Sequence, residues 1–248
     1  MENSPLHFQL ESLRFLEATD FDILEGLFTR EETAGSGKLL AIEGGAADKV
    51  MVLSKGWALR YKSLPDGRRQ ILNFLLPGDI VGFFALLFKT VEYGIETLTP
   101  VTMNSFSPEK LLDAFNNAPR LAVALSWLAG QDERQLDEQI VRVGRRSATE
   151  RMAHLFVELH YRLLQAGIPG DEAQHFPMKQ TILADTLGMS HVHANRSFRT
   201  LVREGLVTLR DGEILLLDPD SLAQVAGFDA GYLEQESLPK ATESALPH

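Results

Sequence analysis

The sequence contains no cysteine among its 248 residues. A disulfide framework, a thiolate nucleophile and a cysteine-bound iron–sulfur cluster are therefore excluded. The sequence also lacks any apolar run of about 18 residues, the length that a membrane-spanning helix requires. Its first residues are acidic and mixed, where a secretory signal would be basic and then apolar. These absences predict a soluble, cytoplasmic protein with no membrane partner.

Histidine is scarce in the first part of the chain, where His7 is the only one before residue 145. Metal-dependent enzymes and haem proteins built on a β-roll normally need histidine ligands, so we expect no metal and no cofactor. A metal site formed by later histidines is the alternative. Their spacing instead favours solvated or helix-face positions for all five: His154, His160, His175, His191 and His193.

Acidic residues outnumber basic ones, giving a formal net charge of -10. Such a charge argues against nonspecific coating of nucleic acid, although the distribution matters more than the sum. Residues 176–210 contain five basic residues against two acidic ones, whereas residues 211–248 contain eight acidic residues and one lysine. The sequence thus contains one basic segment. The polar tail, residues 231–248, is predicted to be disordered.

Short apolar segments separated by glycine and proline fill residues 38–107. Examples are VMVL, RQILNFLL and DIVGFF, which are divided by turns such as PDG and PGD. Closely spaced short strands with such turns are typical of a small antiparallel β-roll. We therefore predict an α+β protein whose residues 1–118 form a cupin-like antiparallel β-roll.

A stretch almost free of helix-breaking residues follows at 119–144. A helix of this length is too long to be covered by one small roll alone. Burial of its apolar stripe against a second copy of the chain is therefore favoured, and packing on its own domain is the alternative. Gly144 is the predicted hinge at its end, and a simple break of the helix is the alternative. The stripe has helical spacing and comprises Leu125, Leu128, Leu136, Ile140 and Val143.

Residues 145–230 carry the pattern of a winged helix-turn-helix. A short helix at 180–187 is followed by Gly188, which can end a helix, and by Ser190, which can cap the next one. That second helix is predicted from residue 191 to about residue 204. Asp211-Gly212 then separates two apolar segments, which is a strong signal for a β-hairpin.

The second of these helices presents side chains that can read DNA. Arginine can donate two hydrogen bonds to guanine, asparagine can pair with adenine, and valine can contact a thymine methyl group. Backbone amides at the capped end, near Ser190, can bind phosphate. An ordinary amphipathic helix with a solvated basic face is the alternative, but the hairpin that follows favours DNA binding. The exposed face comprises Val192, Asn195, Arg196, Arg199 and Arg203.

The order of roll, long helix and winged helix-turn-helix resembles the Crp/Fnr family of bacterial transcription regulators. The resemblance is carried by PGDIVG at 77–82, RRSATERMAHLFVEL at 145–159 and LADTLGMSHVHANRSFRTLVREGLV at 183–207. It implies a regulator and not an enzyme, with the roll as sensor domain. The implied state is a homodimer on double-stranded DNA with a palindromic operator, and RNA polymerase is a further implied partner. The alternative is a cupin-like small-molecule binding protein or enzyme with an accessory C-terminal domain.

The resemblance also implies roles for individual residues. Val192 stands where the family usually has an acidic residue, so the operator should differ from the best-known family consensus. Ser197 likewise stands where an apolar residue is usual. Lys179 and Gln180 fall near the start of the first motif helix, which contacts the DNA backbone. The recognition positions fall on His191, Val192, Asn195 and Arg196.

Relatives that bind cyclic nucleotides carry a Gly-Glu pair and an Arg-Ser or Arg-Thr pair, which hold the ribose and the cyclic phosphate. The first pair here reads Gly82-Phe83, followed by Phe84, and the second falls in EYGIET at 92–97, which has no arginine. The phosphate clamp is therefore missing. We predict that Gly82, Phe83 and Phe84 either line a pocket for an apolar effector of unknown identity or simply fill the core of the roll.

Overall fold

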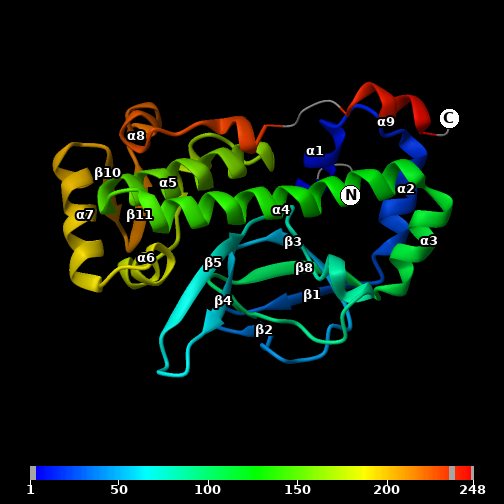
Figure 1. The fold of residues 1–248 in the computed structure, drawn as a ribbon, viewed down its shortest axis with the longest axis horizontal. Coiled ribbons are helices and arrows are strands. Elements are labelled where there is room, and N and C mark those ends of the chain that lie inside the picture. Colours follow the sequence, from blue (N-terminus) through cyan, green and yellow to red (C-terminus); the bar gives the residue numbers. More distant parts are fainter. Residues whose placement is uncertain (1–3, 235–237, 247–248) are drawn as a thin grey trace.

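The computed structural model describes residues 4–234 and 238–246. Figure 1 shows the β-roll on one side of a long helix, α4, and a helical domain around one end of that helix. Helices α1 (Pro5–Glu11), α2 (Ala18–Leu27) and α3 (Glu109–Asn117) gather near its other end (Figure 1). The predicted α+β architecture is confirmed.

The roll consists of two antiparallel four-stranded sheets with orders β1-β8-β3-β6 and β2-β7-β4-β5. Apolar side chains from both sheets, such as Met51, Leu75 and Ile95, meet between them. The strands are short because glycine and proline turns end them. Their bounds are β1 Arg30–Ala34, β2 Leu39–Ala41, β3 Val50–Lys55, β4 Ala58–Ser63, β5 Arg69–Leu75, β6 Ile80–Val81, β7 Gly94–Thr97 and β8 Val101–Phe106.

Helix α4 spans Pro119–Arg145, with the proline in its first turn, where its missing N–H costs nothing. Gly144 lies inside this helix, so the predicted hinge is not at that residue. The chain turns instead at Arg146, whose backbone is extended. Ser147 and Glu150 then form a reciprocal capping box that starts α5 (Ala148–Gln165).

The remaining C-terminal elements form the predicted helix-turn-helix and hairpin. Both turn residues of the hairpin have positive φ, +53° at Asp211 and +85° at Gly212, as a two-residue turn of this kind requires. Strand β9 completes a three-stranded sheet of order β10-β11-β9. The bounds are η2 Glu172–Gln174, β9 His175–Phe176, α6 Gln180–Leu187, α7 His191–Arg203, β10 Val207–Arg210, β11 Glu213–Leu216 and α8 Pro219–Ala226.

One hydrophobic core joins the roll to the winged helix-turn-helix. Trp57 and Phe74 from the roll pack in the same cluster as Phe156 and Phe176 from the C-terminal domain. The ring centroids of Trp57 and Phe176 are 5.6 Å apart. The two predicted domains therefore share buried apolar surface instead of being joined only by a linker.

Polar contacts reinforce the same interface. The Arg69 guanidinium lies 3.0 Å from the Asp185 carboxylate on α6. The side-chain amides of Gln70 and Gln139 both donate to the backbone carbonyl of Thr186, at 2.9 Å and 2.7 Å. The last turn of α6 is thus bound by both β5 and α4.

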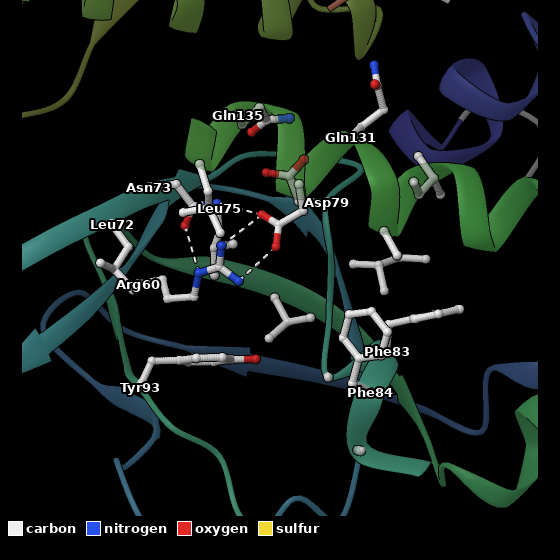
Figure 2. Close-up of a pocket in the computed structure, with 18 of the residues that line it drawn as sticks. Arg60, Leu72, Asn73, Leu75, Asp79, Phe83, Phe84, Tyr93, Gln131 and Gln135 are labelled. Atoms are coloured by element: carbon white, nitrogen blue, oxygen red, sulfur yellow. Dashed lines mark hydrogen bonds and ion pairs between the residues drawn. The ribbon is translucent and has the colours of Figure 1, made fainter. Parts of the chain in front are cut away.

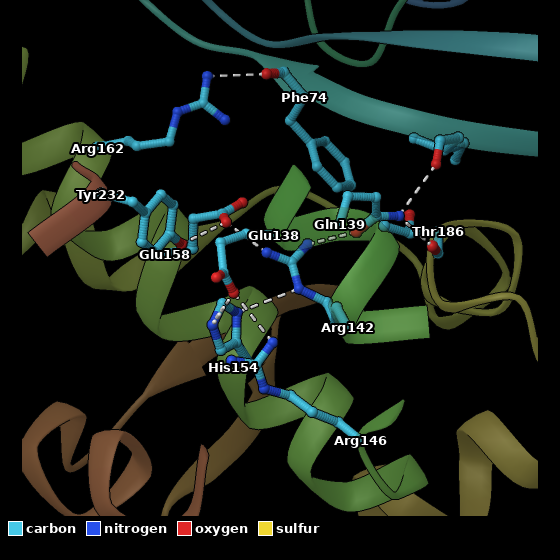
Figure 3. A network of polar contacts seen from close by, with 11 residues as sticks. Phe74, Glu138, Gln139, Arg142, Arg146, His154, Glu158, Arg162, Thr186 and Tyr232 are labelled. Carbon is cyan, nitrogen blue, oxygen red and sulfur yellow. Dashed lines mark hydrogen bonds and ion pairs between the residues drawn. The ribbon is translucent and has the colours of Figure 1, made fainter. Parts of the chain in front are cut away.

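A buried polar network connects α4 to α5 (Figure 3). Arg142 is 2% exposed and forms an ion pair with Glu158. It also donates to the Gln139 side chain at 2.6 Å and to Nδ1 of His154 at 3.2 Å. The Tyr232 hydroxyl donates to Glu158 at 2.6 Å. Because a buried charge without partners is costly, this network favours one packing of α5 on α4.

The start of the polar tail differs from the predicted disorder. Tyr232, in η3 (Ala230–Tyr232), docks on Glu158, and Leu233 is buried. The Leu233 carbonyl accepts a hydrogen bond from the Gln165 side chain at 2.7 Å. The reason is that the Tyr232 side chain finds His154 and Glu158 on α5, and the Leu233 carbonyl finds Gln165 there. Residues 240–245 form α9 (Lys240–Ala245), while 235–237 and 247–248 lie outside the described residues.

The environment of His154 predicts a pH dependence of stability. Burial, followed by the positive charges of Arg142 and Arg146, lowers the pKa of His154 to about 2. The Glu138 carboxylate, 3.4 Å from Nε2, is the acidic group nearest to the ring in this network. In the unfolded chain the histidine pKa is about 6.5, so that state takes up a proton below this pH while the folded state does not. Folding stability should therefore fall as pH decreases from about 6.5, by up to about 1.4 kcal/mol per pH unit.

Urea denaturation of wild type and His154→Gln between pH 7.5 and about pH 5 would measure this contribution. Glutamine keeps an acceptor for Arg142 but cannot titrate. The wild type should lose stability more steeply than the variant below pH 6.5. Equal slopes for the two proteins would show that His154 is not the source of the acid sensitivity.

Candidate nucleic-acid interface and effector cavity

The turn between α6 and α7 follows from two residues. Gly188 ends α6 with φ of +59°, a left-handed conformation that glycine adopts without strain. Ser190 caps α7 by accepting a hydrogen bond from the His193 backbone N–H at 3.3 Å. Ala194, Phe198 and Leu201 are buried in the shared core. The opposite face of α7 consequently points away from the protein.

Most side chains of that opposite face are exposed. Val192 is 76% exposed, although it is a large apolar residue. His191, Arg196 and Arg199 are also exposed. A single exposed valine is common on protein surfaces. Between arginines on a helix, it also suits the major groove, where it can contact a thymine methyl group.

The other predicted DNA-binding residues lie beside this face. Asn195 is partly buried, and its amide donates to the Gln180 side chain at 2.7 Å, which ties the middle of α7 to the start of α6. Lys179 precedes α6 and is exposed. Arg210, at the tip of the hairpin, is exposed as well; it was not among the residues selected from the sequence, although it belongs to the basic segment.

A second candidate site is a cavity of about 540 Å³ between the roll and α4. Gly82, Phe83 and Phe84 lie in its wall, and Arg60, Asn73 and Tyr93 come from the strands and the loop facing them (Figure 2). Arg162, Gln165 and Leu233 of the C-terminal domain complete it. The cavity therefore touches all three parts of the molecule. The contribution of α4 comprises Leu125, Trp127, Leu128, Ala129, Gln131, Asp132, Gln135 and Leu136.

Gly82 positions the two phenylalanines. Its φ is +81°, and a Cβ atom there would lie 2.5 Å from the Lys49 carbonyl oxygen, so no other residue fits without a shift. Helix η1 (Phe83–Leu86) starts directly after it. Phe83 packs on Phe115, with ring centroids 6.3 Å apart, whereas Phe84 is 52% exposed. The phenylalanines thus border the cavity without filling it.

Arg60 is a buried cation in the wall of this cavity, which Arg162 and Lys89 also line, and the sequence analysis did not identify it. Its guanidinium donates to both carboxylate oxygens of Asp132, at 2.9 Å and 2.8 Å. Its Nε donates to the Asn73 side chain at 3.1 Å, and its charge lies 5.1 Å from the Tyr93 ring centroid. The signal that could have revealed it is the alternation in β4, which places Arg60 on the same face as the buried Ala58.

A second ion pair joins the cavity to α5. Asp79, in the PGDIVG turn, accepts hydrogen bonds from Arg162 at 2.6 Å and from the Leu76 backbone N–H at 2.7 Å. Burial raises the pKa of Asp79, and the charge of Arg162 opposes that shift. The turn at 77–79, which leads through β6 to the two phenylalanines, is thereby bound to the C-terminal domain.

The predicted dimer stripe is only partly available on the surface. Ile140 is 65% exposed, and Leu128, Leu136 and Val143 are half-buried. Leu125 is 1% exposed because it packs into the core formed by α1 to α4 and the roll. Leu125 therefore has almost no surface left for a partner, which corrects its place in the predicted interface.

The five later histidines do not converge. His154 and His160 are buried along α5, while His175, His191 and His193 are exposed on β9 and α7. Within residues 4–234 and 238–246, no three His, Asp or Glu side chains are grouped in a way that could hold a metal ion. Nor does the described part of the chain contain a helix long and apolar enough to cross a membrane.

Two protein-family models match the chain. Residues 31–118 match the cyclic nucleotide-binding domain, which corresponds to the roll. Residues 150–225 match the Crp-like helix-turn-helix domain, which corresponds to α5 through most of α8.

Several characterised proteins are similar in sequence. The transcriptional activatory protein AadR of Rhodopseudomonas palustris is 33% identical over 76% of this chain and 79% of its own length. The nitrogen fixation regulation protein FixK of Bradyrhizobium diazoefficiens is also 33% identical, over 77% of this chain and 79% of its own. The fumarate and nitrate reduction regulatory protein of Escherichia coli is 23% identical over 86% of this chain and 84% of its own.

Solved structures share the fold. FixK2 from Bradyrhizobium japonicum superposes with a TM-score of 0.71 at 24% identity, covering 81% of this chain and 98% of its own. The c-di-GMP responsive global regulator CLP from Xanthomonas campestris has a TM-score of 0.61 at 19% identity, covering 81% and 99%.

Proposed function

Because this chain belongs to the Crp/Fnr family of DNA-binding transcription regulators, which are not enzymes, we propose that it binds a palindromic operator as a homodimer. The observation that carries this proposal is the outward face of α7, where Val192, Arg196 and Arg199 are exposed beside a capped helix N-terminus. Each α7 would enter one major groove, and two-fold symmetry would place the two helices about 34 Å apart.

Individual contacts follow from the chemistry of the side chains. Arg196 and Arg199 would read guanine, Asn195 adenine and Val192 a thymine methyl group. Ser190 and His191, at the start of α7, would lie near phosphate, as would Lys179 and Gln180 at the start of α6. Arg210 on the hairpin would add a further phosphate contact.

The dimer would form along α4. Ile140 is its exposed apolar residue towards the C-terminal end. The half-buried Val143 lies beside it, and Leu128 and Leu136 continue the stripe beside the cavity. Such an arrangement would bury a surface that is otherwise unfavourable in water. AadR is named a transcriptional activator, and we infer that this regulator likewise contacts RNA polymerase when bound to DNA in the cytoplasm.

The cavity between the roll and α4 is the proposed effector site. A cyclic nucleotide does not suit it, because the segment 92–97 provides no arginine for the cyclic phosphate. The two cavity arginines are already paired, Arg60 with Asp132 and Arg162 with Asp79. To reach either arginine, a cyclic phosphate would have to displace one of these carboxylates. The remaining cation of the lining, Lys89, is exposed.

Selection of bound sequences from a random DNA library, with the purified wild-type protein, tests the proposed function. The expected result is an inverted repeat whose half-sites are about one helical turn apart, centre to centre. The protein bound to it should be a dimer by mass measurement. Recovery of single half-sites occupied by one chain would refute the homodimer on a palindrome.

Cyclic AMP and cyclic GMP should have no effect on this protein. At millimolar concentration, neither is expected to change the melting temperature or the affinity for the selected operator, because a ligand stabilises a protein only by binding its folded state. Differential scanning fluorimetry and fluorescence anisotropy measure the two quantities. A saturable increase of several degrees with micromolar nucleotide would contradict the absence of a phosphate clamp.

A further inference from the structure

We propose that Arg60 and Asn73 form a carboxylate subsite in the cavity, and that Asp132 occupies it in the absence of ligand. The effector would then be a small carboxylate on an apolar body, which displaces Asp132 when it binds. This inference rests on the proposed function of the cavity as effector site, and it names the chemical class of that effector.

The donors around Asp132 match one carboxylate. Arg60 donates two roughly parallel hydrogen bonds to it, and the Asn73 side-chain amide donates a third at 2.9 Å. Both donors belong to the roll, on the paired strands β4 and β5. Bidentate pairing with arginine is among the strongest recognition modes for a carboxylate. The subsite is therefore already fitted to this group.

Arg60, the member of this ion pair that would bind the ligand, is held in place by its neighbours. The Arg60 side chain is only 10% exposed, its Nε is bound to Asn73, and the Tyr93 ring lies against its guanidinium (Figure 2). A guanidinium held by Asn73 and Tyr93 loses little freedom when an anion binds it. Arg60 would thus remain where it is while its anionic partner is exchanged.

Asp132 is the member of the ion pair that a ligand carboxylate can replace. It comes from a different element, α4, and its side chain is 39% exposed. The carboxylate can therefore turn towards water, whereas a buried Arg60 left unpaired would be costly. When the carboxylate of a ligand replaces Asp132, the charge of Arg60 remains paired. An amide, which carries no charge, could not make the same exchange.

The apolar lining of the cavity indicates which chemical group would carry the ligand's carboxylate. Phe83, Phe84 and Leu72 line the cavity from the roll, and Trp127 and Leu128 line it from α4. A cavity of about 540 Å³ lies within the range of small-molecule sites, which are mostly apolar with a few fixed polar groups. A ring-sized apolar body bearing one carboxylate fits this combination.

Displacement of Asp132 would also change contacts between parts of the molecule outside the cavity. It would remove a bond between the roll and α4 one turn before Leu136, which belongs to the proposed dimer stripe. The same cavity is bordered by Arg162 and Gln165 of α5. An occupied cavity would therefore contact both the dimer helix and the DNA-binding domain.

The test uses Asp132→Ala with four probes: propionate, 3-phenylpropionate and the corresponding amides. Both acids should raise the melting temperature of Asp132→Ala saturably, and 3-phenylpropionate should bind at least ten-fold more tightly than propionate. The amides should have no effect. Wild type should bind 3-phenylpropionate at least ten-fold more weakly than the variant, because Asp132 competes. Asp132→Asn, which preserves the shape of the side chain, repeats the test if the alanine variant does not fold.

Two control variants separate the subsite from general effects. Asp137→Ala removes an exposed carboxylate from the same helix and should respond as wild type does. Asp132→Ala combined with Arg60→Met should no longer respond to either acid. Equal stabilisation by acid and amide, or no response of Asp132→Ala and Asp132→Asn to any acid, overturns the proposal.

Because melting is measured without DNA, the outcome is independent of the operator experiment. If the acids stabilise Asp132→Ala but do not change operator affinity of the wild type at saturation, the subsite is supported and the effector role of the cavity fails. If operator affinity is normal and no acid binds the variants, the proposed DNA-binding function is supported and the carboxylate subsite is refuted.

Discussion

Ile140→Asp is expected to convert the dimer to a monomer and to lower operator affinity by about 100-fold or more, because each half-site would then be bound without its linked partner. Ile140 is 65% exposed in the single chain and lies on the outer side of α4. In a two-fold dimer, Ile140 of one chain would contact Ile140 of the other chain, or residues next to it, in an apolar interface. Two buried carboxylates there would repel each other and lack partners. Light scattering and fluorescence anisotropy measure the two effects.

Because the Ile140 side chain is largely in water, the aspartate variant should keep the melting behaviour of a folded single chain. Ile140→Val, which retains an apolar β-branched side chain, should remain a dimer and bind the operator normally. A stable dimer of Ile140→Asp with unchanged operator affinity would show that the chains associate through another surface.

Arg196→Ala should weaken binding to the operator by about 1 to 3 kcal/mol per half-site and relax the preference at one base position in each half-site. Arg196 is exposed on α7 and faces away from the core, so its removal should leave the fold intact. The loss would come from the two hydrogen bonds that a guanidinium donates to guanine. Anisotropy titrations against the operator and its single-base variants measure both consequences.

Lys179→Ala is the matched comparison, since it removes a charge of the same sign next to α6. It should weaken binding to all sequences about equally and reduce the salt dependence by about one unit of slope. Uniform weakening by Arg196→Ala would place that residue on the DNA backbone. Unchanged affinity would require a different orientation of α7.

The DNA-binding half could be predicted closely because its signals are local. Gly188 ends one helix, Ser190 caps the next, and Asp211-Gly212 makes a two-residue turn. Each of these conformations depends on neighbouring residues alone. The bounds of α6 and α7 consequently agree with those expected from sequence to within a residue.

The cavity could not be predicted in the same way, because its partners are far apart in the chain. Arg60 and Asp132 are separated by 72 positions, and Asp79 and Arg162 by 83. Nothing in the local sequence of either partner identifies the other. The PGDIVG motif indicated the region of the cavity, but its polar groups became visible only when α4 and α5 were placed against the roll.

The packing of the C-terminal domain escaped prediction for a related reason. Trp57 and Phe74 belong to the roll, and nothing in the sequence indicates that their neighbours include Phe176. The average polarity of residues 231–248 likewise predicts disorder and conceals the individual residues that dock. Two residues, Tyr232 and Leu233, are enough to fix it on α5.

The positions of the tryptophans give the molecule two built-in optical reporters, since the chain has only two. Trp57 lies in the seam between the roll and the DNA-binding domain, against Phe176, and Trp127 borders the cavity. With Trp127→Phe, the remaining emission would follow separation of the two domains as a red shift on exposure to water. With Trp57→Phe, it would follow occupancy of the cavity. Intrinsic fluorescence can therefore time the two events independently, without an attached dye.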